Sequence, residues 1–224
     1  AFVILTWRQN QNTLAKNQQL VHQLLERELL LNAQKLDYLK MQIHPHFLFN
    51  TLNTIYGFAL QKSDYTAEMI LKLSNLLDYL LYQSNEPLVE LKEEVQHIQD
   101  YIALEKLRFQ DVLSINFEIE GAWEAILTPP MLFLPFVENA FKHGTIQQGI
   151  FEVKIALRVK AKHIHFSMTN SRTVLAVPSR TPKGIGLKNI RKRLDLLYGD
   201  QYSLEIATKG DLFCVNLDLN QQQQ

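Results

Sequence analysis

The stretch QIHPHFLFN at residues 42–50 places two imidazoles, His44 and His46, on either side of Pro45. The unperturbed pKa of histidine, about 6.5, leaves the ring mostly neutral near pH 7, which is the form that acts as a nucleophile. Proline removes a backbone donor and leaves the carbonyl of Met41 without its helical partner, so we expect a kink or a local loosening here. These histidines are candidates for nucleophilic chemistry, with a hydrogen-bonded place in a helix interface as the alternative.

A second polar group ends the apolar stretch LPFVENAFKHG at residues 134–144. Asn139 and His143 stand four residues apart and share one face of a helix, and Glu138 and Lys142 share the neighbouring face. An amide oxygen can bind magnesium, and a cation can bind phosphates. The pattern fits a magnesium and phosphate site, and a charged helix end capped by glycine is the simpler alternative.

A third candidate is PKGIGLKNIRKRLDLLYG at residues 182–199, where Gly184 and Gly186 come directly before an expected helix. Glycines allow close backbone approach, and the free N–H groups at a helix start bind phosphate oxygens. A plain turn is the alternative. The irregular segment SRTVLAVPSRTPK comes just before and suits a nucleotide lid, because long loops in compact domains are usually functional. Its cations are Arg172, Arg180 and Lys183.

Long helices must position the two histidines. Residues 20–61 hold one proline and one glycine, and their apolar residues follow the 4,3 spacing of a coiled-coil seam. A second helix is expected over Tyr65–Gln83 and a third, charged one over Lys92–Phe109. Two antiparallel helices alone expose an apolar seam, so we expect the first two to dimerise into a four-helix bundle. The seam residues are Leu25, Leu29, Leu36, Leu39 and Ile43, then Leu48, Leu52, Ile55 and Ala59 after the proline.

Beyond Asp111 the apolar period changes from that of helices to that of strands. Four segments alternate, each with one apolar and one polar face. We therefore expect helices over residues 131–143 and 186–197 to cover the sheet on one side only, in a two-layer α/β sandwich within an α+β chain. The alternating apolar residues are Ile115, Phe117 and Ile119; Phe151, Val153, Ile155, Leu157 and Val159; Ile164, Phe166 and Met168; and Phe213, Val215, Leu217 and Leu219.

The composition is that of an ordinary globular protein, with 46% hydrophobic and 21% charged residues. Lys plus Arg equals Asp plus Glu at 23 each, so no broad field favours direct binding to nucleic acid. The single cysteine, Cys214, excludes an intrachain disulfide and a cysteine-built zinc site, which fits a reducing compartment.

The amino-terminal stretch AFVILTW is followed at once by Arg8. Seven residues are too few for the hydrocarbon core of a membrane, which needs about 20. We interpret the stretch as the cytoplasmic end of a transmembrane helix, with Trp7 and Arg8 at the interface. The tip of a small hydrophobic helix is the alternative.

Taken together, QIHPHFLFNTLNTI, LPFVENAFKHG and GIGLKNIRKRLDLLYG resemble, in this order and spacing, the motifs of the LytS/YehU-type sensor histidine kinases. The first resembles the phosphoacceptor box of that family. The second resembles the N box, and the third the second glycine box, of ATPases with the GHKL (Bergerat) fold. YIALEKLRF at residues 101–109 resembles the connecting helix of these kinases. The resemblance covers about residues 35–218.

The resemblance implies a role for each matched residue. His46 would be the phosphoacceptor, His44 a neighbour, and Asn50 would orient the ring or a phosphoryl oxygen. Pro45 would loosen the helix so that a mobile ATP domain reaches the ring. Around ATP, Asn139 would ligate Mg²⁺, Lys142 and His143 would face the phosphates, and Glu138 would polarise the reacting groups. Gly184, Gly186, Leu187 and Asn189 would frame the lid end and the phosphates.

The sequence departs from the superfamily at the first glycine box, which normally reads Asp-x-Gly-x-Gly. Here the corresponding stretch is MTNSRTV, with Asn170 in place of the aspartate that accepts a hydrogen bond from the adenine amino group. An asparagine oxygen still accepts such a bond, but without the charge that strengthens it. The sequence therefore predicts a weakened hydrogen bond to adenine.

The favoured interpretation is the cytoplasmic portion of a bacterial inner-membrane sensor kinase that works as a homodimer. ATP phosphorylates His46, and the phosphoryl group passes to an aspartate of a response regulator. The family resemblance implies that this partner is often a transcription factor of the LytTR type. The alternative is a weak or inactive kinase that relays conformation as a dimeric scaffold; an ATPase outside signalling is a third reading. The expected parts are a juxtamembrane segment (1–19), a dimerisation and phosphotransfer domain (20–85), a connecting helix (86–110), an ATP-binding domain (111–220) and a disordered tail (221–224).

Overall fold

A computed structural model of the chain describes residues 45–82, 86–172 and 185–220, together with four isolated helical positions, 16, 21, 22 and 25. The chain divides into two compact units, Ala1–Leu48 and Phe49–Gln224. The apolar amino-terminal stretch and all but one of the seam residues before Pro45 therefore lie outside the described residues. No helix within the described ranges is both long and apolar enough to cross a membrane.

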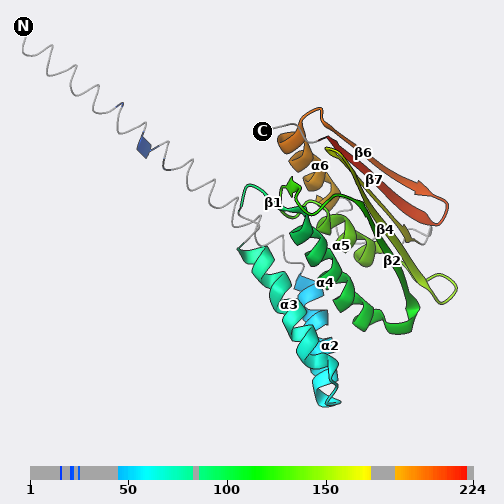
Figure 1. Cartoon of the computed structure of the whole chain (residues 1–224). Coiled ribbons are helices and arrows are strands. Elements are labelled where there is room, and N and C mark those ends of the chain that lie inside the picture. Colours follow the sequence, from blue (N-terminus) through cyan, green and yellow to red (C-terminus); the bar gives the residue numbers. More distant parts are fainter. Residues whose placement is uncertain are drawn as a thin grey trace, which may run out of the picture. The chain divides into compact units, whose positions relative to one another are not determined.

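Two helices, α2 (Pro45–Leu60) and α3 (Tyr65–Leu81), are joined by a short turn and run in opposite directions (Figure 1). Ser63 in the turn accepts a hydrogen bond on Oγ from the N–H of Tyr65, at 3.3 Å. The rings of Phe58 and Tyr65 meet edge to face across the turn, with centroids 6.5 Å apart. The helix expected over Tyr65–Gln83 is confirmed.

Helix α4 (Leu91–Phe109) follows the pair of residues that form β1 (Val89–Glu90) and packs against α3. Its first turn is closed by a capping box in which Glu90 and Glu93 each accept from the other's backbone N–H. Strand β1 pairs antiparallel with β3 (Leu127–Thr128). The third helix predicted from the sequence is confirmed, and it ends in the short 3-10 helix η2 (Gln110–Val112).

The carboxy-terminal half forms a five-stranded sheet in the order β2-β4-β5-β7-β6. The pair β2 and β4 is parallel, and the other neighbours are antiparallel. A parallel pair needs a long crossover, and helix α5 (Leu134–His143) lies within that connection. The strands are β2 (Leu113–Gly121), β4 (Phe151–Lys160), β5 (His163–Ser171), β6 (Tyr202–Lys209) and β7 (Leu212–Asn220).

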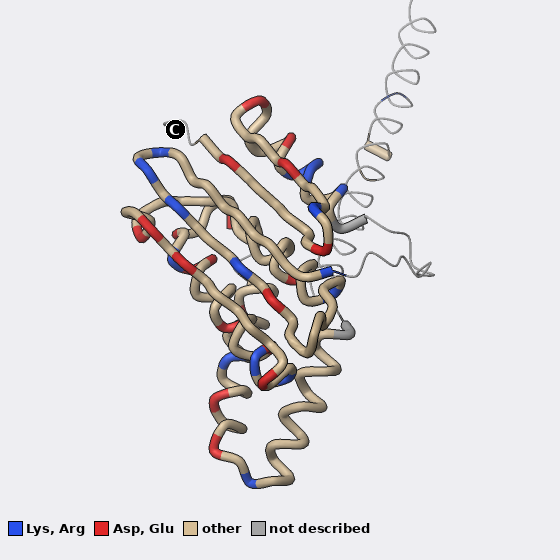
Figure 2. The backbone as a smooth tube through the Cα atoms, turned by 90° about the vertical axis from the view of Figure 1, so that its right-hand side faces the viewer, with Lys and Arg blue, Asp and Glu red and all other residues tan. Residues whose placement is uncertain are grey.

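Helices α5 and α6 (Ile185–Tyr198) lie on one side of the sheet (Figure 1). Phe166 of β5 packs there against the start of α5, with its ring centroid 5.1 Å from that of Phe133 and 5.7 Å from that of Phe136. Figure 2 looks onto the other face, where charged residues follow the strands and no described helix lies in front. Exposed Lys154 and Arg158 of β4 belong to that face. The prediction of a sheet covered on one side is confirmed.

Two details differ from the prediction. Helix α5 begins at Leu134 rather than near Met131, because Met131 has a positive φ of 57° and its neighbours form a turn. Strand β6 was not predicted; its residues are buried only in part, as expected for an edge strand with a weak alternation.

Candidate functional site

Helix α5 carries four polar residues predicted as site residues, all toward its carboxy-terminal end. Glu138 and Asn139 are half-buried, whereas Lys142 and His143 are exposed. The helix is held in place by a buried apolar face, so its polar residues are presented along one edge of that face. The buried residues are Leu134, Phe136, Val137, Ala140 and Phe141.

The end of α5 is tied directly to the end of β5. The N–H of Thr145 donates to the carbonyl of Ser171 at 3.0 Å, and the Ser171 hydroxyl donates back to the carbonyl of Thr145 at 2.8 Å. The N–H of Glu152 on β4 also donates to the Ser171 hydroxyl, at 3.2 Å. This network brings the polar end of α5 next to the position that the sequence assigns to adenine recognition.

That position, Asn170, is 2% exposed. Because residues alternate along a strand, Asn170 lies on the same face of β5 as Phe166, which is the face covered by α5. Its Nδ2 donates to the carbonyl of Ser171 at 3.1 Å, and its Oδ1 has no hydrogen-bond partner within the described part of the chain. A buried acceptor without a partner costs about 1–3 kcal/mol, so this oxygen is suited to receive a donor from a ligand.

Helix α6 supplies the second group of predicted residues. Gly186 lies in its first turn, Leu187 is half-buried and Asn189 is exposed. Gly184 lies outside the described residues, as do residues 173–183 of the predicted lid. The helix packs against α5 and β6, so its amino-terminal turn belongs to the same layer as the polar end of α5.

Arg172, the second residue of the predicted lid, is anchored on the sheet. The N–H of Arg172 donates to the carbonyl of Asp211 at 2.8 Å, and the side-chain amide of Gln147 donates to the carbonyl of Arg172 at 2.9 Å. Arg172 is therefore fixed on the sheet beside the end of α5.

Glu138 has the most perturbed electrostatics of the predicted site residues. Burial raises the pKa of its carboxyl to about 7; the Lys142 ammonium opposes this shift, and the Glu105 carboxylate adds to it. A carboxyl whose pKa lies near the working pH can accept a proton and give it back, which suits a general base.

A polar group of α4 that acts electrostatically on Glu138 was not predicted from the sequence. Tyr101 donates from its hydroxyl to Glu105 at 3.1 Å, and Arg108 pairs with the same carboxylate at 2.7 Å. Glu105 is 1% exposed, and burial raises its pKa to about 7 against the effects of Arg108 and Tyr101. The signal was present in YIALEKLRF, where these residues recur at spacings of four and three.

The predicted phosphoacceptor region lies on α2. His46 belongs to the first unit, and its backbone is helical; His44 lies outside the described residues. Asn50 follows one turn later and is half-buried, and its carbonyl accepts from the Thr54 hydroxyl at 2.9 Å.

Metal binding through side-chain clusters is not a feature of the described residues, which contain no group of three or more His, Cys, Asp or Glu side chains suited to an ion. The sequence prediction names one protein ligand, Asn139. That is compatible with Mg²⁺, which is usually held by one or two protein oxygens together with water and substrate phosphates.

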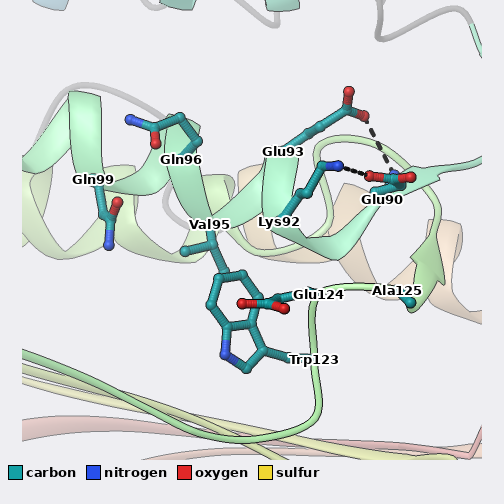
Figure 3. A pocket seen from close by; sticks show the side chains of 9 residues that line it. All are labelled: Glu90, Lys92, Glu93, Val95, Gln96, Gln99, Trp123, Glu124 and Ala125. Carbon is teal, nitrogen blue, oxygen red and sulfur yellow. Dashed lines mark hydrogen bonds and ion pairs between the residues drawn. The ribbon is translucent and has the colours of Figure 1, made fainter.

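A separate open cavity of about 630 Å³ lies between the start of α4 and the residues before β3 (Figure 3). Trp123 and Val95 line it, together with the charged residues Glu90, Lys92 and Glu124. Lys92 pairs with Glu90, which raises the pKa of the lysine. None of the predicted site residues lines this cavity, so it is distinct from the site at the end of α5.

Comparison with known proteins gives a consistent result. Residues 34–113 match the family model described as histidine kinase. The chain is similar to the sensor histidine kinase BtsS of Escherichia coli K12, with 31% identity over 185 residues, which is 82% of this chain and 33% of BtsS. It is also similar to the sensor protein kinase HptS of Staphylococcus aureus USA300, with 28% identity over 91% of this chain and 42% of HptS.

The chain thus spans less than half the length of these curated relatives. Among solved structures, it is similar to the catalytic domain of the histidine kinase ThkA, with 16% identity and a TM-score of 0.43 over 59% of this chain and 94% of that one. The sequence-based resemblance to sensor histidine kinases is confirmed by the family model and the two relatives.

Proposed function

Because residues 34–113 match the histidine kinase family model and the chain is similar to two sensor kinases, we propose that it is the kinase portion of a two-component sensor. In this proposal ATP phosphorylates His46, and the phosphoryl group then passes to an aspartate of a response regulator. A nitrogen of the neutral imidazole attacks the γ-phosphorus, the bond to the β–γ bridging oxygen breaks, and ADP leaves. Glu138 polarises the reacting groups and takes the proton from the second ring nitrogen.

The observation that best supports the proposal is the buried Oδ1 of Asn170, which has no hydrogen-bond partner among the described residues and lies beside the polar end of α5. The adenine amino group would supply the missing donor. From that anchor, the phosphates would extend toward exposed Lys142 and His143, and Asn139 would ligate Mg²⁺. Phosphoryl transfer depends mainly on positioning and charge neutralisation, which these residue types can provide.

The first turn of α6 would complete the phosphate site. Gly184 and Gly186 would let the backbone approach the phosphates, and Leu187 and Asn189 would line the lid end. We propose Asn50 as the residue that orients the ring of His46, since it follows one helical turn later.

The oligomeric state and the partners are part of the same proposal. Apolar side chains on α2 are exposed in the single chain, at spacings that place them along one stripe of the helix. A second copy would cover them in a four-helix bundle. They are Phe49, Leu52, Tyr56 and Leu60, with exposures of 67%, 46%, 65% and 67%. Of the seam predicted after Pro45, Leu52 belongs to this stripe, whereas Ile55 is only 8% exposed within the single chain.

The proposal includes three parts: a dimerisation and phosphotransfer domain of residues 20–85, a connecting helix of residues 86–110 and an ATP-binding domain of residues 111–220. The segment before residue 20 would lead from an inner-membrane anchor. The kinase portion would then lie in the bacterial cytoplasm. The response regulator would be of the type that carries a LytTR DNA-binding domain, so the sensor itself needs no contact with nucleic acid.

Labelled ATP tests the proposal. The chain is incubated with Mg²⁺ and ATP labelled at the γ-phosphate, and we expect acid-labile, base-stable label that is lost in His46→Ala and retained in His44→Ala. Label that persists in His46→Ala would overturn the phosphoacceptor assignment. Nucleotide binding without label in the unsubstituted chain would instead favour the scaffold function.

A further inference from the structure

The turn that precedes α5, residues 130–133, is held by a buried carboxylate from another helix. Glu94 of α4 is 1% exposed and accepts from the N–H groups of Met131, Leu132 and Phe133, at 2.6, 2.9 and 3.2 Å. Such groups at a helix start lack partners within the helix and are usually capped by a neighbouring side chain. Phe133 provides no such cap, so Glu94 takes that role from 37 to 39 residues away.

The carbonyl side of the same turn is held by α6. Arg193 donates from Nη1 to the carbonyl of Met131 at 3.0 Å, and from Nη2 to the carbonyl of Pro130. The backbone of Met131 has a φ of 57°, which is uncommon for a residue other than glycine. The hydrogen bonds on both sides keep this unfavourable conformation in place.

The third partner of the turn comes from α3. The Tyr79 hydroxyl donates to Oε1 of Glu94, and the N–H of Met131 donates to the Tyr79 oxygen at 3.0 Å. Tyr79 is fully buried, and the ring of His97 stacks on it with centroids 3.7 Å apart. Tyr79 thus touches both the carboxylate and the backbone that lead into α5.

A second polar contact joins the same two helices at a different place. Lys72 of α3 pairs with Asp100 of α4 at 3.2 Å, and Asp100 also accepts from the side chain of Gln96 at 3.3 Å. Within the described part of the chain, no hydrogen bond or ion pair of Lys72 or Asp100 reaches residues 130–133. The interface of α3 and α4 therefore contains one polar contact that reaches α5 and one that does not.

The partners of Glu94 favour its charged form. Burial raises the pKa of its carboxyl to about 7, while the hydrogen bonds from residues 131–133 and the Arg193 guanidinium oppose that shift. Hydrogen bonds to an ionised carboxylate are about twice as strong as bonds between neutral groups. A displaced Tyr79 would leave a buried charge with one donor fewer, so α3 and α5 are energetically linked.

We infer that Glu94 is a positioning residue for α5, and that Tyr79 is the contact through which a movement of α3 changes the placement of Glu138 and Asn139. The inference rests on the proposed function of α5 in ATP binding. A movement of α3 in the helix hairpin would then act on the nucleotide site directly, through the contact of Tyr79 with Glu94 and Met131.

A purely structural role is the competing explanation, because buried polar networks also serve only to fix a fold. The two roles differ in where a substitution acts. Loss of a merely structural contact between α3 and α4 lowers stability, whichever contact is removed. Loss of the positioning contact also changes the backbone at residues 131–133 and the rate of the reaction.

The test compares Tyr79→Phe with Lys72→Met, which weakens the same interface away from α5. Hydrogen exchange is measured at the amides of residues 131–133 in the complete chain. We expect Tyr79→Phe to speed exchange at Met131 by about tenfold, as for a lost hydrogen bond in a charged network. Lys72→Met should leave these amides unchanged. Tyr202→Phe, which removes a hydroxyl that donates to Asp195 on α6, controls for loss of a tyrosine hydroxyl.

The second readout is the reaction itself. At saturating Mg-ATP we expect Tyr79→Phe to lower the rate of labelling at least about fivefold, since a small misplacement of reacting groups lowers rates strongly. The Kd for Mg-ATP should rise by less than the rate falls, because Tyr79 touches neither Asn170 nor the first turn of α6, which are also proposed to bind the nucleotide. Wild-type exchange at residues 131–133 in Tyr79→Phe, or equal effects from Lys72→Met, would overturn the inference.

Failure of the proposed function is distinguishable from failure of this inference. A chain that takes no label contradicts the kinase proposal, and the exchange experiment still decides whether Tyr79 positions the start of α5. Glu94→Gln adds a further check, because the amide that replaces the carboxylate has one N–H₂ group, which cannot accept from the backbone N–H groups. We expect faster exchange at all of residues 131–133 and a lower Tm; wild-type exchange in a folded Glu94→Gln chain would refute the role of the carboxylate.

Discussion

The α carbon of Gly144 lies so close to the ring of Phe151 that a β carbon there would stand 2.2 Å from Cε2 of the ring. The same β carbon would stand 2.5 Å from the carbonyl oxygen of Ala140, a backbone atom that cannot rotate away. Phe151 is itself 1% exposed and packs edge to face on Phe141, with centroids 5.6 Å apart. Glycine at this position therefore lets the chain leave α5 against the sheet.

Gly144→Ala should destabilise the chain by about 1–3 kcal/mol, the usual range for overpacking of a rigid site. Because Thr145 follows directly and is bonded to Ser171, we also expect weaker Mg-ATP binding. Chemical denaturation and nucleotide titration measure the two effects. Gly57→Ala is the matched control: a β carbon at Gly57 meets nothing within 4 Å, so alanine should stabilise α2 by about 0.5–1 kcal/mol.

Asn170→Ala should weaken Mg-ATP binding by about tenfold, since it removes the acceptor proposed for the adenine amino group. Asn170→Asp should bind more tightly than the natural chain, because an ionised acceptor strengthens the bond. Calorimetric titration with Mg-ATP measures both. Asn116→Ala, at an exposed asparagine of β2 that donates to Glu118, should bind as the natural chain does. Equal affinity of all variants would remove Asn170 from the site.

The rate of labelling should rise as the pH passes through about 7, where Glu138 loses its proton and becomes able to accept one. The neighbouring Glu105 carboxylate raises the pKa of Glu138. Glu105→Gln should therefore move the rise in rate to lower pH. Initial rates measured from pH 5.5 to about pH 8.5 at saturating Mg-ATP test this. If Glu105→Gln leaves the dependence of the rate on pH unchanged, a group other than Glu138 determines the rise in rate.

The local patterns of the sequence were sufficient to predict most of the elements. Alternation over Phe151–Val159 and over Phe213–Leu219 depends only on which face of a strand is buried, and both strands are present. Strand β6 was not predicted because it is an edge strand that is only partly buried, and such a strand needs little alternation of apolar and polar residues. The parallel pairing of β2 with β4 was not predicted either, since pairing depends on the path of the whole chain rather than on a local period.

The site was predictable where its residues follow one another along a helix, as on α5. It was not predictable where partners come from distant parts of the chain. Glu94 was read as one charge of a charged helix, yet it is buried against a turn 37 to 39 residues later. No local pattern distinguishes such a carboxylate from a solvated one, because its burial is decided by the packing of α3, α4 and α5.

The stacking of His97 on Tyr79 has a consequence for stability at low pH. His97 is 8% exposed, its Nδ1 has no hydrogen-bond partner in the described part of the chain, and burial lowers its pKa to about 4, against the carboxylates of Asp100 and Asp78. Between pH 6.5 and pH 4 the unfolded chain binds a proton that the folded chain does not. The free energy of unfolding should therefore fall in this window as the pH falls, by up to about 1.4 kcal/mol per pH unit from this group alone.

His97→Phe keeps an aromatic ring against Tyr79 and removes the titrating group. We expect the free energy of unfolding of this variant to decline less steeply than that of the natural chain between pH 6.5 and pH 4. The two chains should approach parallel behaviour above pH 6.5, where histidine is neutral in both states. Urea denaturation at several pH values measures the difference, and the buried glutamates contribute equally to both chains and cancel. Parallel curves across the whole range would show that His97 takes up its proton equally in the folded and unfolded chains, and that the stack on Tyr79 tolerates its charge.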